Sequence, residues 1–185
     1  MDRANREQDE WLALRCQSGE PEAFEDLVDT MERPLLYYAA KLLGNEQRAA
    51  DALQDVWIRA FRGIRKLKDP GSLRPWLYRI TYGIAIDRIR HDSSRARAEE
   101  IHFEQFQETA DVTFDDEDVA AVHRALDELD LRHREVLVLH FLEDFPVAEI
   151  AAVVGCPEGT VKSRIYHAKK AMKELLRRGG YGTEK

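Results

Sequence analysis

The 185-residue sequence predicts an all-α protein made of two small helical domains joined by a flexible acidic linker. Apolar residues recur at spacings of three and four along most of the chain, which is the period of an amphipathic helix. The chain has only 6 prolines, and no segment alternates β-branched and polar residues as a half-buried strand does. Residues 92–116 have no sustained helical period and divide the predicted helices into two groups.

The first group is expected to form one domain, residues 1–91. Its predicted helices span residues 7–18, 21–43, 46–64 and 72–91. Glycines and prolines separate these helices, because glycine favours left-handed turns and proline cannot continue a helix. Pro34 lies inside the second helix and is expected to kink or break it, since proline has no backbone N–H.

The second group is expected to form a domain in residues 117–178, followed by a tail in residues 179–185. Its predicted helices span residues 117–129, 131–143, 146–154 and 157–177. Between the two groups, the stretch from Glu99 to Asp118 contains nine acidic residues and no lysine or arginine. Such a segment cannot bury enough apolar area to offset the entropy of ordering it, so residues 92–116 are expected to be a flexible linker.

The charged residues are sorted along the chain. Residues 1–58 carry a net charge of −7, residues 59–90 of +7, residues 91–118 of −8 and residues 119–185 of +1. Two cationic stretches, 59–90 and the later 159–178, are thus separated by an anionic one, which indicates two contacts with a polyanion such as nucleic acid. Ordinary solvated helix faces would give the same pattern, so charge alone leaves both interpretations open.

The sequence lacks the residues that several classes of protein need. The two cysteines, Cys16 and Cys156, are too few for a disulfide scaffold or a four-cysteine zinc site, and no glycine-rich nucleotide loop is present. No apolar segment is long enough for export or a membrane span, which fits a cytoplasmic protein. The acids Asp115–Asp118 could suggest a metal-dependent nuclease, but four consecutive acids without a histidine do not form a fixed octahedral site. We therefore expect no cofactor, no metal and no catalytic residue.

The clearest motif is a helix-turn-helix in residues 147–165. Gly155 can adopt the left-handed conformation that ends a helix, and Pro157 can begin the next helix without its own N–H. The apolar stripe of this second helix is formed by Val161, Ile165, Ala168, Met172 and Leu175. Its other sides carry Thr160, Lys162, Ser163, Tyr166, His167 and Lys170, with Arg164 at the edge of the stripe. This division suits a helix in the major groove of DNA, and the alternative is an αα-hairpin with a basic outer face.

Two predicted helices of the first domain have polar faces of interest. The helix 46–64 turns Asp51, Gln54, Asp55 and Ile58 away from its apolar stripe, as a protein-docking surface or a solvated face would. In the helix 72–91, Tyr78 and Tyr82 are expected to point outward among arginines, next to the basic loop 65–72. Aromatic rings beside cations suit single-stranded nucleic acid, because rings accept stacked bases. Surface tyrosines and a solvated loop are the alternative.

Together these residues resemble the small extracytoplasmic-function group (group 4) of bacterial sigma factors in the sigma-70 family. Four blocks match in order: Glu22–Phe24 with Leu27, Ala50–Phe61, Trp76–Ile80 with Asp87–Arg90, and Gly159–Ile165. Each block is moderately specific, and their order and spacing make the resemblance strong. It covers nearly the whole chain except the linker and the last few residues.

The resemblance implies a bacterial transcription initiation factor that binds core RNA polymerase and promoter DNA. A coiled coil of the largest polymerase subunit would be gripped by Asp51, Gln54, Asp55 and Ile58. The −10 element would be captured as single strand by Arg65, Lys66, Leu67, Lys68, Arg74, Trp76, Arg79, Tyr82, Gly83 and Arg90. The −35 duplex would be read by Thr160, Lys162, Ser163, Arg164, Tyr166, His167 and Lys170. The polymerase flap and an anti-sigma protein are further implied partners, and strand opening would use binding energy rather than ATP.

Three residues depart from the family pattern. Gly83 stands where many members have asparagine, and Leu67 is near a position often held by an aromatic residue. His167 replaces a frequent arginine and is mostly uncharged at neutral pH, which weakens a phosphate or base contact. The acidic segments oppose attraction to phosphates, so the isolated chain is expected to bind promoter DNA weakly. The alternative function is a stand-alone helix-turn-helix regulator, which would need operator affinity of its own without core polymerase.

Overall fold

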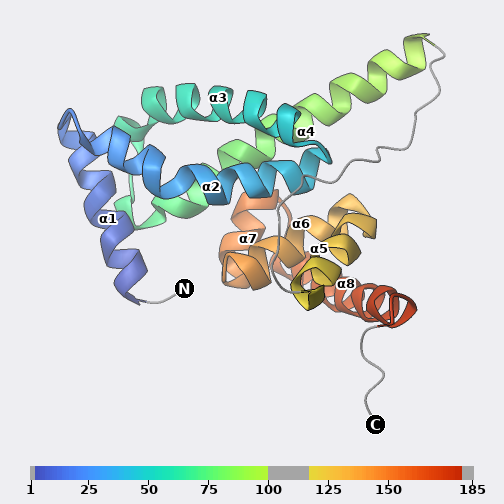
Figure 1. Cartoon of the computed structure of the whole chain (residues 1–185). Coiled ribbons are helices and arrows are strands. Elements are labelled where there is room, and N and C mark those ends of the chain that lie inside the picture. The colour runs from blue at the N-terminus through green and yellow to red at the C-terminus, as the bar shows by residue number, and fades with distance from the viewer. Residues whose placement is uncertain (1–2, 100–116, 181–185) are drawn as a thin grey trace.

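The computed structural model describes residues 3–99 and 117–180, which form four α-helices before residue 100 and four after residue 116 (Figure 1). No β-strand occurs in these residues, and the predicted all-α class is confirmed. The acidic residues 100–116, which make up most of the predicted linker, lie outside the described residues. The last residues of the predicted tail, 181–185, lie outside them as well.

The N-terminal domain is a bundle of three helices with a fourth helix packed against one end (Figure 1). Its helices are α1 (Arg3–Ser18), α2 (Ala23–Leu43), α3 (Glu46–Gly63) and α4 (Leu73–Glu99), with the short 3₁₀ turns η1 (Ile64–Lys66) and η2 (Pro70–Ser72) before α4. The helices α2, α3 and α4 pack on one another, while α1 contacts α2 and both turns. Fully buried side chains of this bundle include Leu27, Leu35, Val56 and Leu77.

Pro34 does not break α2, which is continuous from Ala23 to Leu43. The neighbouring residues Met31 and Leu35 are buried in the core. Proline removes one backbone hydrogen bond from a helix, whereas most of the stability of a protein helix comes from the packing of its apolar face. Packing on both sides of Pro34 therefore keeps the helix intact.

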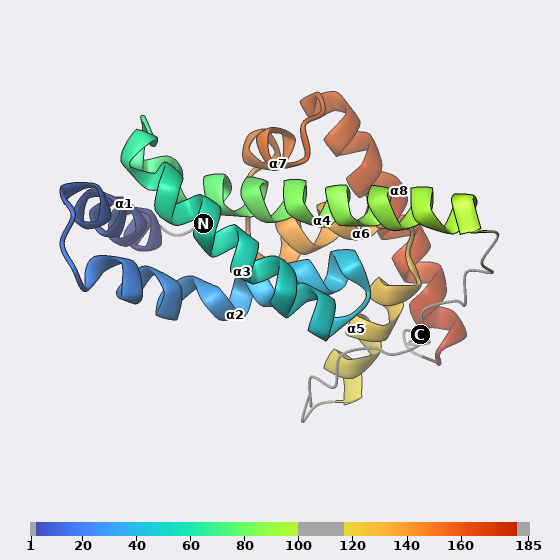
Figure 2. The same ribbon diagram turned by 90° about the horizontal axis from the view of Figure 1, so that it is seen from above.

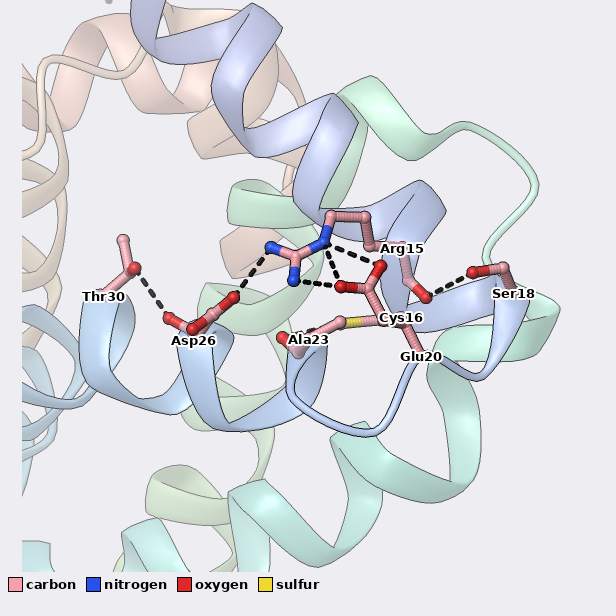
Figure 3. Close-up of polar contacts among 7 residues, drawn as sticks. All are labelled: Arg15, Cys16, Ser18, Glu20, Ala23, Asp26 and Thr30. Carbon is pink, nitrogen blue, oxygen red and sulfur yellow. Dashed lines mark hydrogen bonds and ion pairs between the residues drawn. The ribbon is translucent and has the colours of Figure 1, made fainter.

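The corner between α1 and α2 is held by Arg15, which joins two acidic side chains (Figure 3). Its guanidinium donates to both carboxylate oxygens of Glu20 and, at 2.7 Å, to Asp26 in the first turn of α2. The buried Cys16 thiol donates to the Ala23 carbonyl at 3.2 Å. These contacts fix the direction in which α2 leaves α1, and so the position of α1 beside η1 and η2.

The helix α4 is longer than predicted and continues through Glu99, so residues 92–99 are helical rather than part of a linker. Arg48 on α3 forms an ion pair with Asp92. The Ser93 hydroxyl donates to the Ile89 carbonyl one turn earlier at 2.8 Å. Polar contacts of this kind extend the helix beyond the point where its apolar period ends.

The C-terminal domain is built around its last helix. Its elements are α5 (Glu117–Glu128), α6 (Leu131–Leu137), the π-helical turn η3 (Val138–Leu142), α7 (Val147–Val154) and α8 (Glu158–Arg178). The helix α8 packs against α5, α6 and α7. Gly155 ends α7 in the left-handed conformation with φ of 67°, and α8 begins directly after Pro157, which confirms the predicted helix-turn-helix.

The two domains pack against each other along α4. The helix α7 contacts α4, and α6 contacts α2, as the view from above shows (Figure 2). Buried side chains of both domains consequently form one continuous cluster. Neither the charge pattern nor the helical period of the sequence indicated this contact.

Candidate nucleic-acid interface

The helix α8 has the two faces that its sequence predicted. Val161, Ile165 and Ala168 are buried against the rest of the C-terminal domain. The other sides carry the exposed residues Thr160, Lys162, Ser163, Tyr166, His167 and Lys170. Because these polar side chains begin in the first turn of α8, they can enter a major groove while the buried stripe holds the helix on its domain.

Arg164 differs from its neighbours because its guanidinium turns toward α6. Its Nη1 donates to Oε1 of Glu135 at 2.6 Å. Glu135 is only 2% exposed, and this burial raises the pKa of its carboxyl to about 7, although Arg164 acts in the opposite direction. Arg164 therefore partners a buried acid and positions α8 on α6, a role that the sequence did not reveal. The DNA contact assigned to Arg164 from the sequence stays a prediction.

The basic loop before α4 is held in place by α1. The Gln17 amide donates to the Ile64 carbonyl at 3.1 Å and to the Leu67 carbonyl at 2.7 Å. At the other end of the loop, the Asp69 carboxylate accepts a hydrogen bond from the Gly71 N–H at 3.1 Å. Leu67 is half-buried against the core, and the exposed cations are Arg65, Lys66 and Lys68. The loop thus presents three cations on a backbone that is fixed at both ends.

Arg74 and Trp76, both assigned to the −10 element, anchor the start of α4 inside the N-terminal domain. Arg74 donates to both carboxylate oxygens of Asp9 on α1, at 2.9 and 3.3 Å, and Asp9 is 3% exposed. Trp76 is half-buried and lies so close to Gly63 that a Cβ at Gly63 would be 2.9 Å from the indole ring. Asp9 and Gln17 are therefore positioning residues of this region, and no motif in the sequence marked them.

The prediction that Tyr78 and Tyr82 point outward is wrong. Tyr78 is fully buried, and its ring centroid lies 5.2 Å from that of Tyr38 and 5.0 Å from that of Phe145 in the C-terminal domain. Tyr82 is half-buried, and burial beside Glu135 raises the pKa of its hydroxyl to about 12. The reason is that the other domain covers this side of α4. The remaining predicted −10 residues on α4 are the exposed Arg79 and Arg90 and the half-buried Gly83.

The predicted docking face of α3 is open to solvent. Its four exposed residues are Asp51, Gln54, Asp55 and Ile58. Arg88 on α4 donates to the Asp55 carboxylate at 2.7 Å and to the Asp51 carbonyl at 2.9 Å, which ties this face to α4. Phe61, one turn after Ile58, is 66% exposed and extends the apolar part of the surface. An exposed phenylalanine near an isoleucine of the same face could have been found from helical spacing alone.

A groove of about 430 Å³ lies on the C-terminal domain between α5, η3 and α8. Its apolar lining includes Val122, Leu126, Phe141, Leu142 and Met172. Basic residues of α8 also line the groove: Lys169, Lys173 and Arg177. Such a surface fits an apolar segment of a partner that carries acidic residues beside its apolar ones.

Residues 3–99 and 117–180 contain neither a metal-binding cluster nor a helix suited to a membrane. No group of three His, Cys, Asp or Glu side chains in these ranges is placed to hold a metal ion. Asp115 and Asp116 of the acidic run lie outside the described residues. None of the described helices combines the length and the apolar character that crossing a bilayer requires.

Comparison with known proteins identifies both domains. The family model "Sigma-70 region 2" matches residues 27–95, and "Sigma-70, region 4" matches residues 120–172. RNA polymerase sigma-H factor of Pseudomonas aeruginosa is 30% identical over 183 residues, covering 92% of this chain and 95% of the relative. ECF RNA polymerase sigma factor SigM of Mycobacterium tuberculosis is 32% identical and covers 94% of this chain and 87% of its own length.

Solved structures share the fold. The sigma factor RpoE, in complex with the anti-sigma factor NepR from Bartonella quintana, has a TM-score of 0.76 at 23% identity and covers 84% of this chain and 98% of its own. CnrH, in complex with the cytosolic domain of CnrY, has a TM-score of 0.67 at 28% identity. The match covers 92% of this chain and 97% of CnrH. The chain therefore belongs to the extracytoplasmic-function sigma factors of the sigma-70 family, and it is a non-enzymatic factor for transcription initiation with RNA polymerase.

Proposed function

We propose that this sigma factor directs core RNA polymerase to promoters through two separate DNA contacts. The exposed polar side of α8 reads the −35 duplex, and the basic loop 65–72 together with α4 captures the −10 element as a single strand. The two parts act as domains of residues 1–91 and 117–178, joined by residues 92–116, of which 92–99 continue α4. The observation that carries the proposal is the division of α8 into a buried apolar stripe and an exposed row of donors and cations.

The exposed face of α3 docks on the coiled coil of the largest polymerase subunit. Ile58 and Phe61 supply apolar contact area, and Asp51 and Asp55 supply negative charge next to it. An exposed apolar patch with a polar rim is the usual composition of a protein interface. Arg88 holds the Asp55 carboxylate in place before the partner arrives, which lowers the entropy lost on binding.

The groove between α5, η3 and α8 is the contact site for the polymerase flap. Phe141 and Leu142 are 54% and 44% exposed, which is a large apolar exposure for residues outside an interface. Its basic lining from Lys169 and Lys173 favours acidic residues beside the apolar anchor of the partner. This groove lies away from the exposed residues Lys162 and Ser163 near the start of α8, so one helix can serve DNA and polymerase at once.

An anti-sigma protein is a further proposed partner. The solved structures of RpoE and CnrH similar to this chain were determined in complex with NepR and CnrY, respectively. A partner of this kind would hold the factor away from polymerase until a signal releases it. We place the activity in the cytoplasm, where bacterial polymerase meets its promoters.

Run-off transcription with core polymerase on a promoter library tests the proposal and yields both DNA elements. We expect defined start sites with the full-length chain and none with core polymerase alone. Replacing Lys162 and Lys170 together by alanine should weaken initiation at promoters that depend on the −35 element, and Arg178→Ala, at the exposed end of the same helix, serves as the control. A chain that fails to bind core polymerase, or that binds without directing it to any start site, would contradict the proposal. A gel shift without polymerase separates it from a stand-alone regulator.

A further inference from the structure

The side of α1 that faces away from the core carries two large apolar residues. Trp11 is 58% exposed and Leu14 is 49% exposed. Residues three apart are neighbours on a helix, so these two side chains form one patch. The buried residues of α1 include Leu12, Ala13 and Cys16, which lie on the opposite side. The patch of Trp11 and Leu14 therefore contributes little to the packing of the N-terminal domain.

Trp11 is held in a fixed orientation by Arg15. The guanidinium carbon of Arg15 lies 4.4 Å from the centroid of the Trp11 ring, which is a cation–π distance. Arg15 is itself fixed by its contacts with Glu20 and Asp26 (Figure 3). An aromatic side chain that is already ordered loses little entropy on binding, and tryptophan is enriched among the residues that dominate protein interfaces. The patch thus has the character of an anchor for a protein partner.

The charge around this patch is negative. Residues 6–26 contain seven acidic residues, two arginines and no lysine. Glu10, one helical turn before Leu14, is exposed beside the patch. A partner surface that combines apolar groups with cations would complement these residues best.

The groove between α5, η3 and α8 has that complementary composition. Its lining is apolar, with Phe141 among the exposed members, and its volume is about 430 Å³. Lys169, Lys173 and Arg177 are spaced four residues apart on α8, so they line one side of the groove with positive charge. Within one molecule, α1 and this groove lie at opposite ends, as Figure 1 and Figure 2 show. The two surfaces can therefore meet only between molecules.

From this complementarity we propose that copies of the chain associate head to tail: the patch of Trp11 and Leu14 on one copy docks in the groove between α5, η3 and α8 of a second copy. The contact joins two different surfaces, so every assembly keeps one patch and one groove for the next copy. Growth consequently continues beyond a dimer. The inference goes beyond the proposed function, but it uses the groove assigned there to the polymerase flap, and a groove filled by a second copy excludes the flap.

Sedimentation velocity of the full-length chain tests the association. A small patch gives a weak contact, so the concentration series runs from about 5 to about 500 μM. The weight-average mass of the wild type should rise from the monomer mass of 21.4 kDa past that of a dimer. Trp11→Ala disables the patch and Phe141→Asp disables the groove, and each should weaken association at least about tenfold. Phe61→Ala, on exposed α3, and Val119→Asp, on α5 outside the groove, are the matched controls and should associate like the wild type.

A mixture of the two disabled variants identifies which surfaces meet. Phe141→Asp retains its patch and Trp11→Ala retains its groove, so one contact is possible between them and no further copy can follow. An equimolar mixture should therefore form a one-to-one dimer that grows no further. Circular dichroism of each variant should match that of the wild type, which separates lost association from lost folding.

Three outcomes would overturn the head-to-tail contact. The first is a wild type that stays monomeric over the whole series, because the groove would then belong to another partner. The second is association of Trp11→Ala or Phe141→Asp as strong as that of the wild type. The third is a mixture of these variants that stays monomeric. None of these measurements involves polymerase, so run-off transcription tests the proposed function separately.

Discussion

The two helices proposed to contact DNA, α8 and α4, differ in how far the aromatic and basic side chains on their outer sides are exposed to solvent. The helix α8 keeps Lys162 and Tyr166 exposed, and it packs against α5, α6 and α7 of its own domain. The helix α4 has Tyr78 buried under Phe145 of the other domain. One of the two proposed DNA surfaces is therefore exposed, whereas the C-terminal domain covers Tyr78 on the helix of the other.

The difference follows from how many sides of each helix are apolar. The helix α4 carries a stripe toward its own bundle, including Leu73 and Leu77, and a second row that contains Tyr78, Thr81 and Ala85. All of these residues are 1% exposed or less. A helix with two apolar sides needs neighbours on both, and on the second side Tyr78 of α4 packs against Tyr38 of α2 and Phe145 of the C-terminal domain.

The largest effect is expected for Arg164→Ala. Removing the guanidinium leaves the buried carboxyl of Glu135 without its charged partner, and breaking a buried pair in this way costs about 3 kcal/mol. Urea unfolding of the full chain should show this loss, and Arg164→Ala combined with Glu135→Leu should recover most of it. Unchanged stability together with lost use of the −35 element would mean that Arg164 belongs to the DNA-reading side of α8.

The next effect concerns α3, which the C-terminal domain leaves exposed. Ile58→Asp should weaken binding to core polymerase at least about tenfold, or ~1.4 kcal/mol, because it places a charge in the apolar part of the docking face. Fluorescence anisotropy with core polymerase measures the affinity. Asp29→Asn, on an exposed part of α2, provides the control. Equal affinities for the wild type and Ile58→Asp would remove α3 from the polymerase contact.

A single cation of α8 should have a smaller effect. Lys162→Ala should cost about 1 kcal/mol of promoter binding by the polymerase complex and reduce the slope of log affinity against log salt by about one. Titrations at several salt concentrations measure both quantities. An unchanged slope would show that Lys162 does not meet a phosphate, and the exposed side of α8 would then need another ligand.

The stability of the folded chain should also respond to pH through Glu135. Because the pKa of its carboxyl in the folded chain is about 7, above the ordinary 4.5, the folded state binds the proton more tightly and gains stability at low pH. This contribution is complete below about pH 4.5 and is lost as the pH rises through about 7. Groups that face Glu135 are Tyr82 from α4, Arg164 from α8, and Arg132 and Asp130 near it in the chain.

Glu135→Gln isolates this pH effect from other titrating groups. Burial lowers the pKa of His123, so His123 makes the folded chain less stable at low pH and opposes Glu135. Subtracting the unfolding free energies of Glu135→Gln from those of the wild type between pH 5 and pH 8 cancels the His123 contribution. The unfolding free energy of the wild type minus that of Glu135→Gln should decrease as the pH rises. A difference that is constant over this range would contradict the raised pKa.

The smallest effect is expected for Gln17→Ala. The substitution removes the two hydrogen bonds that hold the loop at Ile64 and Leu67, and each contributes about 1 kcal/mol or less. We expect faster amide hydrogen exchange in residues 64–68 and a modest loss of −10 capture. Replacing the exposed Ser18 by alanine removes one local hydrogen bond of α1 and serves as the control. Unchanged exchange would mean that the loop is fixed by other contacts.

Local patterns in the sequence were sufficient for the elements and for one of the two DNA surfaces. The positions of Gly155 and Pro157 predicted the turn before α8, and the spacing of Val161 and Ile165 predicted its buried side. The end of α4 was predicted too early, since an ion pair such as Arg48 with Asp92 joins residues far apart in the sequence. Gln17 and Asp9 were missed for the same reason, because their partners lie on other elements.

By itself, the sequence determined the all-α class, the two helical groups, the helix-turn-helix and the exposed face of α3, because each depends on the period and the capping of one helix. Only the tertiary structure decided that Tyr78 is buried and Tyr82 half-buried. An aromatic side chain on the second side of a helix can face solvent, a nucleic-acid base or another domain. The spacing of apolar residues along the sequence is the same in all three cases. The contact with Phe145 is what distinguishes them, and it depends on how the two domains pack against each other.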